Sequence, residues 1–152
     1  MKKICIIGIL CLAAGVLVLL ITHGSNELLN ESTAVSVPCD GVSLEVSATK
    51  QKLDFTIKSE KIDYIVYSSF QKSMALEMLQ DGKWYVVSKT KLSMDMEEPV
   101  SPDSSVAREI KWKDYYEHDL SKGRYRLVFT FWAMQGGQQG DNYTIMQEFM
   151  VD

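Results

Sequence analysis

Residues 120–132 have the sequence Leu-Ser-Lys-Gly-Arg-Tyr-Arg-Leu-Val-Phe-Thr-Phe-Trp. From Tyr125 onward, apolar and polar side chains alternate along this stretch. The apolar side chains that fall on one face are Tyr125, Leu127, Phe129 and Phe131. The side chains that fall on the other face include Arg124, Arg126 and Thr130. A period of two with aromatic residues on one side predicts a β-strand with one buried face.

The start of this strand carries the spacing Leu-x-x-Gly-x-Tyr, formed by Leu120, Gly123 and Tyr125. The spacing resembles the tyrosine corner of immunoglobulin-like sandwiches. In that corner a Tyr near the start of a central strand bonds back to the backbone of the connection before it. We therefore expect Tyr125 to be buried, with its hydroxyl bonded to backbone near Leu120 or Asp119.

Other segments show the same alternation. Residues 42–47 and 53–58 predict two antiparallel strands joined by a turn at Thr49-Lys50-Gln51. Asp81-Gly82 separates two further strand-like runs and predicts a hairpin, because both turn residues tolerate a positive φ. The remaining segments are predicted as a loop over 92–105, a strand over 106–112, a helical turn over 112–117, a loop over 135–142 and a final strand over 143–151. About seven short strands predict an all-β fold, an antiparallel β-sandwich.

Several of these motifs together resemble a known family. They are Gly41-Val-Ser-Leu-Glu-Val, Asp81-Gly-Lys-Trp-Tyr, Ile110-x-Trp112, Gly123-x-Tyr125-Arg126 and Glu148-Phe149. The resemblance is to the bacterial immunoglobulin-like domain of exported, membrane-anchored or lipoprotein-type proteins of Gram-positive bacteria, and it covers residues 39–152. It implies an extracytoplasmic β-sandwich and brings no catalytic residue. The chain departs from the pattern at Lys122, where the family often has Pro, and it has no lipobox before Cys11.

The N-terminus predicts a membrane segment. After Lys2 and Lys3, the eighteen residues Ile4–Ile21 carry no charge, a length that can span a bilayer. The two lysines favour a cytoplasmic start and an exported remainder. We favour an uncleaved single transmembrane helix over residues 1–21, with a cleaved signal peptide as the alternative. Residues 22–38 are polar and are predicted to form a stalk before the domain at 39–152.

The charge and the cysteines restrict the possible partners. The formal net charge is −4, and an acidic chain argues against nucleic acid as a partner. Outside the apolar segment, Cys39 stands alone, so an intradomain disulfide is excluded. Cys39 is a free thiol, an intermolecular bridge or a small buried apolar residue.

The sequence contains no recognisable catalytic or metal motif. The two histidines are His23, beside the membrane segment, and His118, in the connection before the corner. The chain has no Gly-x-Ser-x-Gly, His-Glu-x-x-His or Cys-x-x-Cys. The acidic stretch from Asp95 to Asp103 fits no calcium-loop spacing and is predicted to be a solvated loop. We expect no cofactor, no metal and no catalytic activity.

Two places are candidate binding surfaces. Arg124 and Arg126 share one strand face and either grip an acidic partner or pair with Glu45, Glu77 or Glu148. The loop predicted over 135–142 joins the last two strands, the position of a binding loop in antibody variable domains. Its candidate binding residues are Trp132, Met134, Gln135 and Gln138. If the loop is a binding edge, we expect Trp132 or Met134 to be exposed beside it; the alternative is a mobile hairpin tip without a binding role.

The remaining aromatic residues are interpreted as structural. Trp84, Trp112 and Phe149 are expected to pack in the core or the corner, beside Leu120, Gly123 and Tyr125. The sequence thus predicts a single-pass protein of the cell membrane with an extracytoplasmic domain. That domain would be a non-catalytic binding or structural module of the bacterial cell envelope, whose partner is a protein or a cell-wall polymer. The alternative is an accessory or inhibitory protein that modulates an exported enzyme or receptor.

Overall fold

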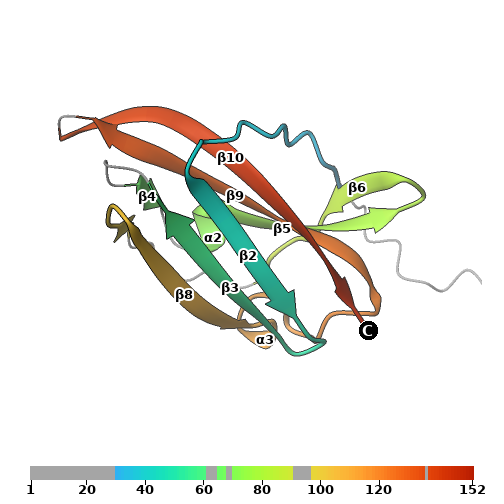
Figure 1. Cartoon of the computed structure of the whole chain (residues 1–152). Helices are drawn as coiled ribbons and strands as arrows, with labels where there is room; N and C mark the ends of the chain where they lie inside the picture. The colour runs from blue at the N-terminus through green and yellow to red at the C-terminus, as the bar shows by residue number, and fades with distance from the viewer. Residues whose placement is uncertain (1–29, 61–64, 68–69, 91–96, 136) are drawn as a thin grey trace, which may run out of the picture.

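The computed structural model describes residues 30–60, 65–67, 70–90, 97–135 and 137–152 (Figure 1). The predicted membrane segment and residues 22–29 of the predicted stalk lie outside these residues. Among the described residues, no helix is long and apolar enough to cross a membrane. The described chain forms two antiparallel sheets, with seven and three strands. The prediction of an all-β antiparallel fold is therefore confirmed for the described part of the chain, but the predicted number of about seven strands is wrong, since the described residues form ten.

The larger sheet has a branched order. Its strands are β1 (Asn30–Glu31), β4 (Ile65–Tyr67), β5 (Met74–Gln80), β6 (Lys83–Val86), β7 (Glu98–Val100), β9 (Gly123–Gln135) and β10 (Gln138–Val151). β9 lies at the centre and pairs with β10 over almost its whole length. On its other edge, β5 pairs with the first half of β9, and β4 pairs with the second half. β6 and β1 continue the sheet beyond β5, while β7 continues it beyond β4.

The smaller sheet consists of β2 (Val42–Ala48), β3 (Lys52–Ser59) and β8 (Ser104–Lys111). β2 and β3 are antiparallel neighbours joined by the turn at residues 49–51, as predicted. Two short helices, α2 (Phe70–Ser73) and α3 (Lys113–Tyr116), connect strands. The helical turn predicted over residues 112–117 is therefore confirmed as α3.

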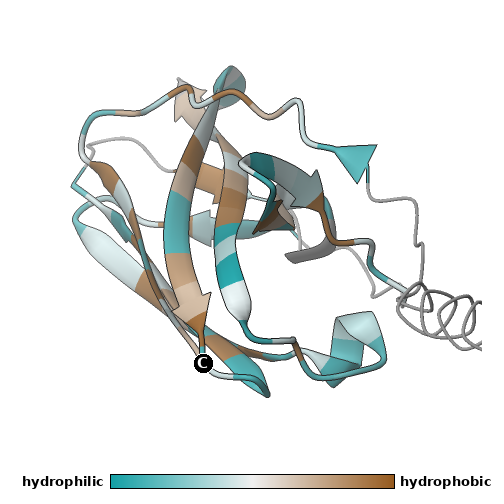
Figure 2. Cartoon of the chain, turned by 90° about the vertical axis from the view of Figure 1, so that its right-hand side faces the viewer, coloured by the Kyte–Doolittle hydropathy of each residue, from teal (hydrophilic) through white to brown (hydrophobic). Residues whose placement is uncertain are grey.

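The hydrophobic core lies between the two sheets. From β9 it receives Tyr125, Leu127, Phe129 and Phe131, each at most 2% exposed, so the alternation predicted for this strand is confirmed. From β3 it receives Leu53, Phe55 and Ile57. Because alternate residues of each strand point to opposite faces, the other face of each sheet is turned away from this core. Figure 2 shows the resulting alternation of hydrophilic and hydrophobic residues along the strands.

The tyrosine corner is confirmed. The Tyr125 hydroxyl donates to the backbone carbonyl of Ser121 over 3.0 Å, which is adjacent to Leu120, where the acceptor was expected. The backbone N–H of Leu120 donates to the carbonyl of Lys50. At Gly123 a Cβ would lie 3.3 Å from the Tyr125 ring, so glycine lets the ring approach the backbone closely.

The hairpin at Asp81-Gly82 is confirmed. Both residues have positive φ, 50° and 79°, and they join β5 to β6. The loop predicted over 92–105 is wrong in part, because β7 and the first residues of β8 lie within it. Residues 91–96 lie outside the described part of the chain. Pro99 led to the prediction of a loop, because proline disfavours a central strand. It is tolerated in an edge strand such as β7.

The loop predicted over residues 135–142 is also wrong. β9 and β10 extend into this stretch, with Gln135 opposite Gln138 and Met134 opposite Gln139. The register then shifts by one residue between Gln139 and Asn142, which is a β-bulge. Glycine has low strand propensity, but pairing along a long hairpin overrides that preference.

Residues 30–37, which the sequence analysis assigned to the stalk, lie against the larger sheet. We refer to them as the N-terminal strap (Figure 1, the blue stretch between β6 and the start of β2). At one edge of the sheet β1 pairs with β6, and at the opposite edge Val37 pairs with Thr144 of β10. The strap therefore crosses the face of the sheet that is turned away from the core. Val128 on this face is only 5% exposed, although it lies outside the core cluster, which is consistent with cover by the strap.

Candidate functional site

The outer face of the larger sheet, turned away from the smaller sheet, carries most of the residues that the sequence analysis singled out. On β9 this face holds Arg124, Arg126, Val128, Thr130, Trp132 and Met134, which alternate with the core residues. The pairing registers divide the face into two halves. Charged residues occupy the half beside β5 and β6, and uncharged residues occupy the half beside β4 and β7.

The charged half is built around Arg126. Its Nε donates to the carboxylate of Glu77 on β5 over 2.6 Å, and the two side chains are only 14% and 2% exposed. The guanidinium carbon lies 4.5 Å from the centroid of the Trp84 ring, which is cation–π geometry. The second oxygen of Glu77 accepts a hydrogen bond of 2.5 Å from the hydroxyl of Ser32 in the strap. The cluster therefore fixes the strap to the sheet.

Arg124 lies two residues before Arg126 and pairs differently. Its Nε donates to Glu148 on β10 over 2.8 Å, and the two side chains are 54% and 45% exposed. The predicted pairing of both arginines with glutamates across the sheet is confirmed, since Glu77 and Glu148 are the partners. Glu45, the third glutamate considered, pairs with Lys58 on the smaller sheet. Both guanidinium groups are thus already engaged within the chain.

Of the three aromatic residues expected in the core or the corner, Trp112 and Phe149 lie there, whereas Trp84 lies on the outer face of the larger sheet. Trp112 is fully buried, and its Nε1 donates to the carbonyl of Thr49 over 2.9 Å. Phe149 packs against the core and stacks on Tyr125 with ring centroids 5.9 Å apart. Trp84 lies instead on the outer face, partly exposed, beneath Arg126. The short strand β6 belongs to the margin of the sheet, so its tryptophan covers an ion pair and does not enter the core.

The uncharged half consists of a row of four residues that lie opposite one another on neighbouring strands, and of one adjacent pair. Pro99 on β7 lies opposite Val66 on β4, Val66 lies opposite Trp132 on β9, and Trp132 lies opposite Asn142 on β10. Directly opposite side chains on one face lie about 4.5 to 5.5 Å apart at Cβ. The next pair toward the hairpin tip is Met134 with Gln139. We refer to Pro99, Val66, Trp132, Asn142, Met134 and Gln139 as the neutral patch.

The exposure of the neutral patch differs from what the sequence predicted. Trp132 and Met134 are partly exposed, and not fully exposed as expected, because both lie within a paired strand and not beside a free loop. Asn142, Gln139 and Pro99 are exposed. At the tip, Gln138 is exposed, and Gly137 adopts a φ of 81° that favours glycine. Gln135 pairs with Gln138 at the tip.

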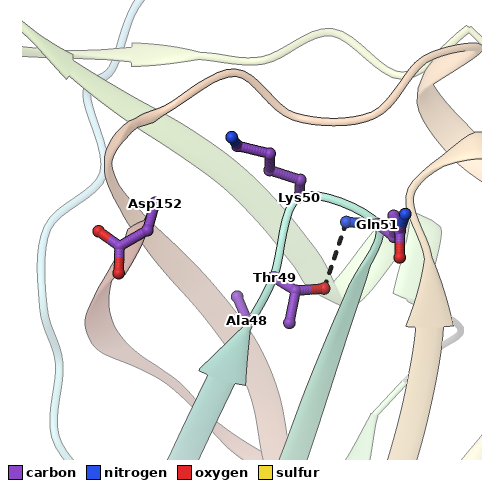
Figure 3. Close-up of a pocket in the computed structure, with 5 residues that line it drawn as sticks. All are labelled: Ala48, Thr49, Lys50, Gln51 and Asp152. Carbon is purple, nitrogen blue, oxygen red and sulfur yellow. Dashed lines mark hydrogen bonds between the residues drawn. The ribbon is translucent and has the colours of Figure 1, made fainter.

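An open pocket lies at the other end of the sandwich (Figure 3). Ala48, Thr49, Lys50, Gln51 and Asp152 line it. The backbone N–H of Gln51 donates to the hydroxyl of Thr49 over 3.2 Å, and the carbonyl of Lys50 holds the backbone of Leu120. The turn is therefore tied to the tyrosine corner, and its arrangement is that of a structural support.

Groups suited to catalysis or metal binding do not gather at one place in the described residues. Within them, no three His, Cys, Asp or Glu side chains lie close enough to hold a metal ion. His118 is exposed, and its Nδ1 lies 2.9 Å from the carbonyl of Asp119. Cys39 is buried, which agrees with the interpretation as a small apolar residue. His23 and Asp95 lie outside the described part of the chain.

One residue of the acidic stretch has a structural role. Glu98 accepts a hydrogen bond of 2.6 Å from the hydroxyl of Tyr67 and pairs with Arg108 over 2.9 Å. Arg108 belongs to β8, so the interaction joins the edges of the two sheets. Burial, together with the Glu98 carboxylate, raises the pKa of the Tyr67 hydroxyl above its ordinary value.

The sequence analysis identified Trp132 and Met134, but it identified neither the other residues of the neutral patch nor the strap. The row through Val66 and Pro99 depends on β4 and β7, two three-residue strands whose pairing partners lie far away in the chain. The strap contains Val35 and Val37 within a polar segment, a weak sign of extended structure. Its attachment at both edges of the sheet depends on residues far away in the chain.

The geometry can be compared with known proteins. A search of curated proteins finds no match to this chain. The model of a family described as the bacterial Ig-like domain matches residues 33–150, which is well over half of the chain and includes most of the strap. The strap thus lies largely within the matched domain, together with the smaller sheet, the larger sheet apart from β1, and the tyrosine corner. The chain belongs to the bacterial Ig-like domain family.

Proposed function

We propose that this protein is a membrane-anchored binding module of the bacterial cell envelope, of the Gram-positive type, with its Ig-like domain outside the cytoplasm and without catalytic activity. The observation that carries the proposal is the succession of two parts in one chain. Eighteen uncharged residues follow two lysines, and an Ig-like sandwich follows them. Domains of this family suggest an extracellular or structural module, and the apolar segment supplies an anchor of spanning length.

The side chains of the domain support binding over catalysis. Nucleophilic catalysis needs a nucleophile, a base and an orienting group within hydrogen-bond reach of one another. The described residues bring His118 only to a neighbouring backbone carbonyl. They do present a sheet face on which partly exposed apolar side chains lie beside exposed amides, and such a face suits recognition.

Membrane topology tests the proposal directly. The full chain, with a C-terminal epitope tag, is expressed in a Gram-positive host, and intact cells are treated with a protease that does not cross the membrane. We expect the tag to be lost from intact cells and the untreated chain to remain in membranes after an alkaline wash. A tag protected in intact cells would contradict the extracytoplasmic placement. A mature chain that starts between His23 and Glu31 would contradict the anchor.

Crosslinking in the same cells tests binding. We expect the anchored chain to be captured with a wall polymer or a protein through the outer face of the larger sheet. Capture of an exported enzyme whose activity changes when the chain is deleted would support the alternative of an accessory or inhibitory protein.

A further inference from the structure

The neutral patch has the properties of a site for an uncharged sugar chain. We propose that it binds a neutral glycan, with one sugar ring stacked on the indole of Trp132 and neighbouring hydroxyls bonded by the amides of Asn142 and Gln139. This inference rests on the proposed function, because an envelope glycan is reached only from outside the membrane. It specifies the chemical class of the ligand and its place on the domain.

The position of Trp132 supports stacking. β9 is paired on both sides at this residue, with Val66 of β4 and with Asn142 of β10. The backbone beneath the ring is therefore held in place, and the ring lies in the middle of a cross-strand row. The side chain is partly exposed and does not belong to the hydrophobic core cluster. A fixed aromatic ring with an accessible surface provides a flat apolar platform at low entropic cost.

The surroundings of the ring match the two-sided character of a sugar. On one side Val66 and Pro99 extend the apolar surface. On the other side Asn142 is exposed, and Gln139 follows at the next pair toward the tip. An amide offers both donors and an acceptor, so one side chain bonds adjacent hydroxyl groups. A pyranose ring has apolar C–H faces and a polar rim, which fits this arrangement.

The absence of charged side chains in the neutral patch favours an uncharged polymer of the envelope. All six residues of the neutral patch are uncharged. The basic residues of the outer face on β9, Arg124 and Arg126, lie in the other half and are paired with glutamates. A phosphate-rich or carboxylate-rich polymer needs unpaired cationic groups to replace its hydration. The neutral patch offers none, so an uncharged chain is favoured over an anionic one.

A protein partner fits the patch less well. A stable protein interface involves about 20 to 30 residues on each side, whereas the neutral patch has six. Strand addition needs a free backbone edge, and at Trp132 both edges of β9 are occupied. Recognition at this place is therefore by side chains over a small area, as expected for a sugar.

Binding is tested with the full chain in lipid nanodiscs. The neutral probes are chitohexaose and cellohexaose. Gram-positive cell walls from which acid has removed the phosphate polymers are a third probe, in which the glycan strands still carry peptide carboxylates. Untreated walls and purified polyglycerol phosphate are the anionic comparison. We expect binding to at least one neutral probe and none to polyglycerol phosphate. Binding to none of the neutral probes, or to untreated walls and polyglycerol phosphate alone, overturns the proposal.

Matched variants locate the site. Trp132→Ala should weaken the binding of the neutral probe about tenfold or more, because a stacking contact is lost. Asn142→Asp keeps the size of the side chain, adds a charge and removes the amide donors, and it should weaken binding comparably. Arg124→Ala, an exposed residue on the charged half of the same face, should leave binding unchanged. The folded state of each variant is checked by circular dichroism.

The outcomes separate the two proposals. If both neutral-patch variants bind the probe as tightly as the unaltered chain, the patch is not the glycan site and the inference is refuted. Capture of a protein that depends on Trp132 without any glycan binding also refutes it. The protease experiment decides the placement of the domain independently. An extracytoplasmic domain that binds no neutral glycan leaves the proposed function standing and removes only the ligand class.

Discussion

Arg124 and Arg126 allow a direct comparison of an exposed and a buried ion pair on one strand. Each pairs with a glutamate on a neighbouring strand, but the Arg126 pair is almost fully buried, whereas about half of each side chain in the Arg124 pair is exposed. Truncating one partner of a buried pair leaves an uncompensated charge and costs about 3 to 5 kcal/mol. An exposed pair contributes about 0 to 1 kcal/mol. We therefore expect Arg126→Met to be far more destabilising than Arg124→Met.

The assay is urea unfolding of a fragment spanning residues 30–152, which contains every residue of the core cluster. With a slope of about 2 kcal/mol per molar urea, the Arg126→Met midpoint should fall by about 1.5 to 2.5 M. The Arg124→Met midpoint should fall by no more than about 0.5 M. The double variant Glu77→Leu with Arg126→Met removes both charges and should recover most of the lost stability.

Equal effects of the two arginine substitutions would refute this reasoning, since burial would then not determine the energy. A double variant as unstable as Arg126→Met alone would contradict the role of the unpaired Glu77 carboxylate. The packing of Arg126 over Trp84 would then be the main contribution.

Three further predictions concern stability. Tyr125→Phe removes the hydrogen bond to the Ser121 carbonyl and should cost about 0.5 to 1.5 kcal/mol with the fold retained, measured by the same unfolding assay; an unchanged midpoint would show that the corner bond contributes nothing. Gly82→Ala places a side chain at a φ of 79° with no atom near its Cβ, so backbone strain alone should lower the free energy of unfolding by about 1 to 2 kcal/mol. Asp81→Asn is the matched control and should leave it almost unchanged, because asparagine tolerates a positive φ. Burial lowers the pKa of Lys89 from its ordinary 10.5 to about 8. Between these two pH values the unfolded chain binds more protons than the folded chain, so the free energy of unfolding should rise with pH above about 8. Burial raises the pKa values of Tyr67 and Tyr116 above the ordinary 10. Above about pH 10 the folded chain therefore binds more protons than the unfolded chain, and the free energy of unfolding should fall. Lys89→Met should abolish the rise in stability above about pH 8 and leave the fall above about pH 10 unchanged.

The elements that the sequence predicted correctly are those whose signal is local. The alternation in β9 and β3, the positive φ at Asp81-Gly82 and the spacing of the tyrosine corner all lie within a few residues of one another. Such patterns report directly which side chains face the core. The acceptor of the Tyr125 bond, the Ser121 carbonyl, is adjacent to Leu120, as the spacing of the corner predicted.

The features that escaped prediction depend on distant partners. β4 and β7 have three residues each, and their extended structure depends on pairing: β4 pairs with β9 and with β7, and β7 pairs with β4. The glycine and glutamine residues at the hairpin tip resemble a loop in composition, and pairing with the opposite strand makes them extended. The buried Arg126–Glu77 pair packs against Trp84 of β6 and bonds to Ser32 of the strap, so no property of the sequence around Arg126 distinguishes it from Arg124.

The N-terminal strap also determines how the domain responds to a mechanical load. Tension on Asn30 directed away from the sheet would load the two residue pairs between β1 and β6 first. Detaching residues 30–37 would release about 25 Å of chain. None of these residues belongs to the hydrophobic core cluster, so their detachment would leave the apolar contacts between the two sheets in place. The strap is therefore a length of chain that the domain can release before the sandwich itself opens.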